Sequence, residues 1–122
     1  YKRQEWDLAA GADDPQGRSG PFRPSGQGLG VGVSRPLPVD RDHDDVSPRG
    51  VRDLSGNGRE WTRDKVVLGG EDFAILRGRM YTMATPLTYN ELRRYRDPQN
   101  SPMQRVNVPS PYTGFRIVIP LE

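Results

Sequence analysis

The stretch GVRDLSGNGREWTRD, residues 50–64, is the most informative part of this chain. It places glycines, a serine and an asparagine between two carboxylates, Asp53 and Glu60, and a tryptophan follows directly. Glycine adopts backbone conformations that other residues avoid, so the stretch predicts a tight loop. Three interpretations compete for this loop: a surface turn, a phosphate-binding loop, or a cation site made of carboxylates and backbone carbonyls.

The composition is poor in apolar side chains and rich in loop-forming residues. Only 33% of the 122 residues are hydrophobic, whereas the chain contains 14 glycines and 12 prolines. We therefore expect one loop-rich domain with a thin core. Its stability should depend on a bound ion, a partner chain or sequence outside these residues.

Charge, hydropathy and cysteine content exclude several classes of protein. The 18 basic and 16 acidic residues are interspersed along the chain, which argues against a nucleic-acid interface. No run of 18 apolar residues occurs, so we expect no membrane span in this chain. The cysteine count of zero excludes disulfides, thiolate metal centres and thiol nucleophiles within these residues.

The first forty residues predict a short helix and then a long loop. RQEWDLAAG, residues 3–11, has Trp6 and Ala10 at helical spacing and Gly11 as the terminating residue. Residues 12–38 are as rich in Gly, Pro and Ser as a linker. GLGVGVS within this loop does not match a dinucleotide fingerprint, because no apolar strand precedes it and prolines follow.

Later segments predict a small antiparallel sheet. DKVVLGG (residues 64–70) and FAILRG (residues 73–78) have the length and composition of strands, and FRIVIPL (residues 115–121) is the strongest strand signal. TYNELRRYRD (residues 88–97) is ambiguous. Thr88 and Glu91 have the spacing of a capping box, which favours a helix, but the run could also be a strand that enters a turn.

Five motifs in sequence order point to a known family. EWDLAAG, PVD, GVRDLSGNGREWTRD, ILRG and TGFRIVIP resemble, in order and approximate spacing, the C-terminal part of the formylglycine-generating enzyme family, also called sulfatase-modifying factors. The most specific match is GN-x-x-EW after an acidic position. The resemblance implies an α+β fold, irregular and loop-rich, related to C-type lectins, with small antiparallel sheets and few helices.

The resemblance also has an implication for domain organisation. In the family, the helix that ends in EWEYAARGG lies well inside the domain. Residues 1–122 are therefore expected to be the C-terminal portion of a single domain, with residues 12–38 as a long loop within it. The N-terminal half would be missing from this sequence or carried on another chain, as a partner.

A structural calcium site is implied for the central loop. In the family, calcium is held at the spacing D/N-x-x-G-x-x-x-E, with a further carbonyl between the last two positions. These positions fall on the Asp53 side chain, the Gly56 carbonyl, the Gly58 carbonyl and the Glu60 side chain. Calcium prefers such oxygen ligands. The alternative is a type I or II turn whose acids face water.

Catalysis is where the chain departs from the family. The enzymes hold copper with two cysteine thiolates that lie between the LRGGSW strand and the closing GFR strand. This interval contains no cysteine here, so we expect no copper centre. Hydroxyl and thioether groups do not replace soft thiolates in one-electron copper chemistry. A related branch uses histidine-ligated non-haem iron, and here the only histidine is His43.

A binding surface is expected where the enzymes carry their active surface. LRGGSW is replaced by LRGRMY, residues 76–81, and the following segment is rich in Arg and Tyr. These residue types dominate binding hot spots. The alternative is that the tyrosines fill the core and the arginines pair with nearby acids. The candidate residues for binding a protein or small-molecule ligand are Arg79, Tyr81, Tyr89, Arg93, Tyr95 and Arg96.

These features predict a non-catalytic, calcium-stabilised binding or regulatory domain. In bacteria, domains of this kind occur as C-terminal domains of serine/threonine kinases. The alternatives are an iron oxidoreductase of the sulfoxide-synthase-like branch and a ligand-display receptor with a C-type-lectin fold.

Two further features carry weaker predictions. DRDHDD, residues 40–45, could bind a divalent ion, although a solvated loop is the more ordinary interpretation. Arg116, in the closing motif, is expected to be a structural arginine bonded to loop carbonyls rather than a substrate contact.

Overall fold

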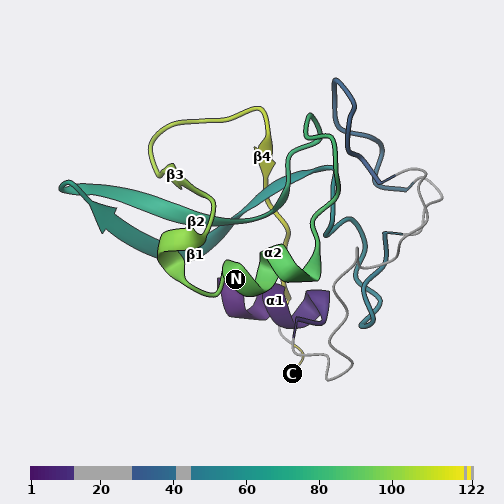
Figure 1. The fold of residues 1–122 in the computed structure, drawn as a ribbon, viewed down its shortest axis with the longest axis horizontal. Helices are drawn as coiled ribbons and strands as arrows, with labels where there is room; N and C mark the ends of the chain where they lie inside the picture. Colours follow the sequence, from purple (N-terminus) through teal and green to yellow (C-terminus); the bar gives the residue numbers. More distant parts are fainter. Residues whose placement is uncertain (13–28, 41–44, 120, 122) are drawn as a thin grey trace.

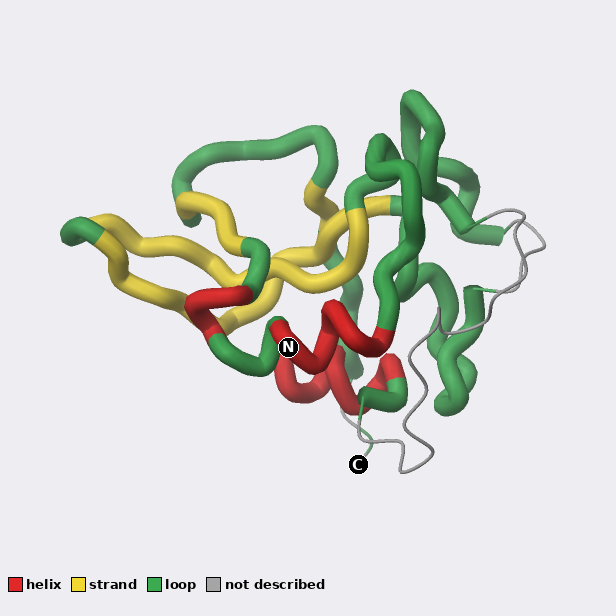
Figure 2. The backbone as a smooth tube through the Cα atoms, viewed as in Figure 1, coloured by secondary structure: helices red, strands yellow, loops and turns green. Residues whose placement is uncertain are grey.

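A small sheet with two short helices against it makes up most of the regular secondary structure of the described residues (Figures 1 and 2). The computed structural model describes residues 1–12, 29–40, 45–119 and 121. The sheet has four strands in the order β3-β2-β1-β4. The elements are α1 (Arg3–Ala10), β1 (Gly58–Leu68), β2 (Glu71–Arg79), α2 (Tyr89–Arg94), a 3-10 helix (Pro98–Asn100), β3 (Met103–Arg105) and β4 (Thr113–Gly114).

The helix expected near the N-terminus is confirmed as α1. The Glu5 carboxylate accepts a hydrogen bond of 2.6 Å from the Lys2 backbone N–H, which satisfies a donor that the first turn leaves open. Gly11 ends the helix in the left-handed conformation, with φ of 82°. Trp6 and Ala10 are buried, as the spacing predicts.

The two central strands are also confirmed, as one long hairpin, but β1 begins at Gly58, within the stretch predicted as a loop. β1 and β2 pair antiparallel from Gly58↔Arg79 to Leu68↔Glu71, with an irregularity between Trp61 and Lys65. Gly69 and Gly70 both have positive φ, 58° and 78°, as the two-residue turns that match strand twist require. The register places Glu60 directly opposite Arg77, at the end of the hairpin nearest the helices.

The ambiguous segment after β2 is a helix. Thr88 Oγ1 accepts a hydrogen bond of 3.2 Å from the Glu91 backbone N–H, as the capping spacing predicts for α2. Tyr89 and Leu92 on α2 and Trp6 and Ala10 on α1 belong to one buried core cluster, which Leu54 completes from the central loop. This small cluster holds the two helices side by side (Figure 1).

The prediction of a strand over residues 115–121 is wrong. Only Thr113 and Gly114 pair, and they pair parallel with β1, so the sheet is mixed rather than purely antiparallel. Residues 115–119 have no regular secondary structure, and Phe115 and Ile119 are 78% and 79% exposed. Alternating apolar residues indicate an extended backbone whose side chains point to opposite sides. A β-strand also needs a neighbouring strand to which its backbone can hydrogen-bond. Within the described residues this segment has none.

Candidate functional site

The central loop, residues 53–60, runs from a loop into the first three residues of β1 and is held in shape by a second loop, residues 29–39. Asn57 adopts a φ of 66°, which is unusual for a residue with a side chain. Its amide group accepts a hydrogen bond from the Leu37 N–H at 2.6 Å and donates one to the Leu37 carbonyl at 2.9 Å. The Asn57 N–H donates to the Gly30 carbonyl at 2.8 Å. The Asn57 side chain therefore makes with Leu37 the two hydrogen bonds that a neighbouring backbone would make, and these bonds link the two loops.

Glycine is required where these loops touch. A Cβ atom at Gly56 would lie 1.8 Å from the Leu29 carbonyl oxygen, and one at Gly30 would lie 2.7 Å from the Asn57 backbone. Either distance is too short for any side chain. The close approach of the two backbones therefore explains why position 56 is a glycine, whether or not an ion is bound.

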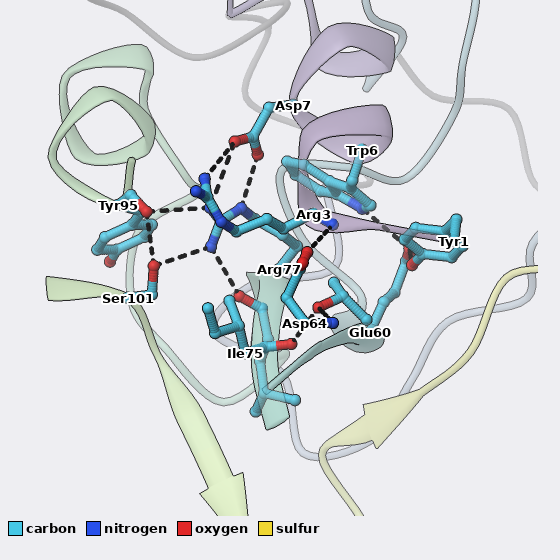
Figure 3. A network of polar contacts seen from close by, with 12 residues as sticks. Tyr1, Arg3, Trp6, Asp7, Glu60, Asp64, Ile75, Arg77, Tyr95 and Ser101 are labelled. Carbon is cyan, nitrogen blue, oxygen red and sulfur yellow. Dashed lines mark hydrogen bonds and ion pairs between the residues drawn. The ribbon is translucent and has the colours of Figure 1, made fainter. Parts of the chain in front are cut away.

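Glu60 is the centre of a network of hydrogen bonds that joins the loop to both ends of the described chain. Its carboxylate accepts from the Tyr1 hydroxyl at 2.6 Å and from Trp6 Nε1 at 2.9 Å (Figure 3). Arg116 donates to it through Nε at 3.2 Å and through Nη2 at 2.8 Å. Arg116 Nη2 also donates to the Arg52 carbonyl at 2.8 Å, which confirms the expected bonding of this arginine to a loop carbonyl.

The network changes the acidity of its members. Burial, together with the charge and hydrogen bond of Glu60, raises the pKa of the Tyr1 hydroxyl far above its ordinary value. Burial acts to lower the pKa of Arg116, but the hydrogen bond and charge of Glu60 outweigh it and raise that pKa. Both pKa shifts keep the proton on the donor, so Tyr1 and Arg116 remain hydrogen-bond donors to Glu60 at neutral pH.

The residues expected to hold calcium lie together, with one complication. Asp53, Gly56, Gly58 and Glu60 line one cavity, and both carboxylates are largely buried. The donor set fits calcium in kind, because carboxylates and carbonyls are its preferred ligands. However, the Glu60 carboxylate already faces the Arg116 guanidinium, so an ion there would compete with an internal cation. Within the described residues, no cluster of three or more His, Cys, Asp or Glu side chains is placed to hold a metal.

A second network, buried under the helices, was not foreseen from the sequence. Arg77 Nε donates to Asp7 at 2.6 Å, and its Nη2 donates to the Tyr95 carbonyl at 3.0 Å (Figure 3). Ser101 accepts from Arg77 Nη1 at 3.3 Å and donates to the same Tyr95 carbonyl at 2.6 Å. The arginine lies in the ILRG motif and the aspartate in EWDLAAG. A charged residue within each of two motifs rich in apolar side chains was a signal for a buried polar contact, although it did not indicate that the two residues meet.

Three of the six predicted ligand-binding residues are buried. Arg79 forms an ion pair with Glu91 of α2. Tyr89 donates to the Ala10 carbonyl at 3.0 Å within the core cluster. Tyr81 is also buried, but it lines the same cavity as the central loop. The structure thus gives Arg79 and Tyr89 roles in packing, and contact of these two with a ligand remains a prediction.

The other three predicted residues are more accessible. Arg93 and Tyr95 are half-buried and Arg96 is exposed. Arg96 Nη2 donates to the Ala12 carbonyl at 2.9 Å, and Arg93 Nη1 donates to Asn90 Oδ1 at 3.2 Å. Arg93, Tyr95 and Arg96 thus lie in or next to α2. Of the six predicted ligand-binding residues, only Tyr81 lines the cavity beside the central loop. The six residues therefore do not converge on one surface.

A cavity lies beside the central loop. It has a volume of about 440 Å³ and lies between residues 36–39, the central loop and residues 111–116. Tyr81 and Tyr112 form an aromatic wall, with ring centroids 5.5 Å apart. Arg59 also lines it, and burial lowers the pKa of this arginine. Within the described residues, its buried Nε has no hydrogen-bond partner.

The acidic cluster of residues 40–45 is only partly described. Residues 41–44, including His43, lie outside the described residues. Asp45 is fully buried, and its carboxylate accepts from the Ser55 N–H at 3.1 and 3.2 Å. At least this member of the cluster supports the central loop from within.

Comparison with known proteins gives one match. The family model of the sulfatase-modifying factor enzyme 1-like domain matches residues 3–121. No match was found among curated proteins or among solved structures. Within the described part of the chain, no helix is long and apolar enough to cross a membrane.

Proposed function

Because the chain belongs to the sulfatase-modifying factor enzyme 1-like family, we propose that it is a binding domain of this family that does not catalyse the family's thiol oxidation. The absence of cysteine from all 122 residues carries this proposal. The resemblance places both copper-binding thiolates between β2 and β4. The only sulfur atoms in this interval are the thioethers of Met80, Met83 and Met103. Thioethers do not supply the thiolate ligation that this chemistry needs.

The cavity beside the central loop is where we expect the ligand. Its volume lies within the range of about 300 to 1,000 Å³ that is usual for small-molecule sites. An aromatic wall and one incompletely partnered arginine are suited to a planar ligand that carries a hydrogen-bond acceptor. A small molecule or the side chain of a bound peptide would satisfy these groups.

A screen of aromatic carboxylates by ligand-observed NMR tests this assignment. Compounds that bind the cavity should lose binding in Tyr112→Ala, because Tyr112 supplies half of the aromatic wall. Phe73→Ala is the matched control, because Phe73 does not line the cavity. Binding that survives Tyr112→Ala, or that is lost equally in Phe73→Ala, would contradict the assignment.

Calcium in the central loop is a second proposal, supported by the common cavity of its four predicted ligands. Calorimetric titration with calcium chloride should show binding that Asp53→Ala weakens by at least about tenfold. Arg116→Gln should tighten binding, because it removes the cation that competes for Glu60. The assignment is wrong if Asp53→Ala and Glu60→Ala both leave calcium affinity unchanged.

Two wider proposals rest on the resemblance alone. The first is that the domain has a regulatory role at the C-terminus of a bacterial serine/threonine kinase, which a kinase domain encoded upstream in the same reading frame would support. The second is a companion N-terminal half of the same domain. Native mass spectrometry tests it, because a second polypeptide would add to the 13.7 kDa of this chain.

A further inference from the structure

Arg59 is a half-buried cation for which the described residues provide no counter-charge. Its Nε is buried without a hydrogen-bond acceptor, and its guanidinium forms no ion pair with any described residue. Removing a charge from water is unfavourable unless a partner compensates for the lost hydration. A bound anion would provide this compensation.

The strands beside Arg59 explain why no carboxylate of the sheet reaches it. Arg59 lies in β1 between Gly78 of β2 and Thr113 of β4, and neither of these neighbours carries an acid. The next residue along β1, Glu60, is already paired with Arg116 at 2.8 Å. The acids closest in the sheet and in the sequence therefore leave Arg59 unneutralised.

A second arginine increases the positive charge near this position. Burial lowers the pKa of Arg59, and the charge of Arg79 acts in the same direction. Arg79 also has a buried Nε without an acceptor among the described residues. The environment of Arg59 therefore favours a negatively charged group.

The cavity beside the central loop carries a small excess of positive charge. Five charged residues line it, three arginines and two carboxylates: Arg52, Asp53, Arg59, Glu60 and Arg116. One negative charge would neutralise the excess, whereas a doubly charged phosphate would exceed it close to the two carboxylates. The planar guanidinium also matches the geometry of a carboxylate. These features favour a singly charged carboxylate over a phosphate.

On the basis of the proposed ligand site in this cavity, we propose that its ligand is an ionised carboxylic acid and that Arg59 binds the carboxylate. The aromatic wall of Tyr81 and Tyr112 then contacts the apolar part of the ligand. Arg59 determines specificity, because a neutral amide of the same shape would leave the guanidinium without a counter-charge.

Titration of the full chain with phenylacetate and with its neutral counterpart phenylacetamide tests the proposal. Ligand-observed NMR in the presence of a calcium chelator measures both affinities. The acid should bind at least about tenfold more tightly than the amide, because hydrogen bonds between charged groups are the stronger ones. Phenyl phosphate should bind more weakly than phenylacetate.

Arg59→Gln should lower the affinity for phenylacetate to that for phenylacetamide and leave the affinity for the amide unchanged. Arg63→Gln is the matched control, because Arg63 is an exposed arginine of the same strand that does not line the cavity. It should bind both compounds as the wild type does.

A short peptide that ends in phenylalanine distinguishes two sources of the carboxylate. It would be titrated as the free acid and as the C-terminal amide. Tighter binding of the peptide acid than of phenylacetate would assign the carboxylate to a peptide terminus, and the reverse order would assign it to a small molecule. Either order supports recognition of a carboxylate, provided that each acid binds more tightly than its amide.

The stability of the ligand-free protein is an independent readout. Arg59→Gln should melt at or above the wild-type temperature, because it removes a charge without a partner. A melting temperature clearly below that of Arg63→Gln would show that the protein itself supplies the counter-charge, and it would overturn the inference.

The binding data also separate this inference from the proposed function. Equal affinities for acid and amide, with binding still lost in Tyr112→Ala, would overturn carboxylate recognition and leave the ligand site in place. If neither the acids nor the amides bind the wild type, both the inference and the assignment of the cavity fail.

Discussion

The central loop and the closing segment of residues 113–119, here called the β4 edge, are linked by the ion pair between Glu60 and Arg116 and by the pairing of β4 with β1. They differ in how their groups are satisfied. In the loop, Asn57 and Glu60 have several hydrogen-bond partners within the chain. The backbone at Gly56 also lies too close to Leu29 for any side chain, which fixes the course of the loop. In residues 115–119, large apolar side chains are exposed, and no strand among the described residues lies beside the backbone. The polar groups of the loop are therefore satisfied by described residues, whereas the apolar side chains of the edge are not covered by them.

The largest expected effect breaks the loop at its tightest point. Gly56→Ala should lower the free energy of unfolding by more than about 3 kcal/mol, because the new methyl group would overlap the Leu29 carbonyl. Chemical denaturation followed by fluorescence measures this change.

Gly50→Ala is the control for Gly56→Ala, because it separates steric overlap from backbone strain. Gly50 has a φ of 82° but no atom near its missing Cβ, so the substitution should cost only about 1 to 2 kcal/mol. A Gly56→Ala protein that is as stable as the wild type would show that the two loops do not touch as described.

A smaller effect is expected from the carboxylate that links the two regions. Glu60→Gln should lower the free energy of unfolding by about 2 kcal/mol, because Arg116 loses its counter-charge and the Tyr1 and Trp6 donors lose a charged acceptor. Thermal denaturation measures it. Glu71→Gln is the matched control: its ion pair with Arg105 is exposed, so the change should stay within about 0.5 kcal/mol. Equal effects would mean that the Glu60 network adds nothing beyond a surface ion pair.

The Tyr1 contact should appear as a dependence of stability on alkaline pH. Its pKa is raised in the folded chain, so the neutral hydroxyl is favoured by folding. This contribution is fully present below the unfolded pKa of about 10 and is lost as pH rises above it. Tyr1→Phe should therefore flatten the fall in stability between about pH 10 and 11.5. An unchanged slope in the variant would contradict the buried hydrogen bond to Glu60.

The smallest effect is expected in the β4 edge. Phe115→Ser should change the unfolding free energy by less than about 0.5 kcal/mol at 1 µM protein, because the ring is already largely exposed. Chemical denaturation measures this change. A large loss at 1 µM would place Phe115 in a core and remove the contrast between the two regions.

Elements whose signals are local could be predicted from the sequence. The N-terminal helix and the two central strands follow from spacing and composition, and the Thr88 cap favours α2; each of these signals acts within a few residues. The family, which the order of the motifs predicts, is confirmed over residues 3–121, and the α+β class is confirmed by the described residues. The short α2 was ambiguous only because a single-turn signal competes with a strand-like composition.

Features that depend on distant partners were harder to predict. The closing segment has the alternation of a strand, but its neighbour is not among the described residues, so the pattern alone misled. Arg77 and Asp7 are 70 positions apart, and nothing local indicates that they meet. The expected binding residues rest on amino-acid type alone. Amino-acid type does not distinguish the buried Arg79, which pairs with Glu91, from the exposed Arg96. Burial of this kind is set by the tertiary fold.

The most direct test of a binding domain without the family's oxidation chemistry is a turnover assay on the full chain. The protein would be incubated with copper(I), oxygen and a cysteine-containing peptide, and both oxygen consumption and the mass of the peptide would be followed. The proposed function predicts no oxygen consumption above that of free copper and no change in peptide mass. Repeated, protein-dependent conversion of the peptide would contradict it, because these 122 residues would then catalyse without a thiolate.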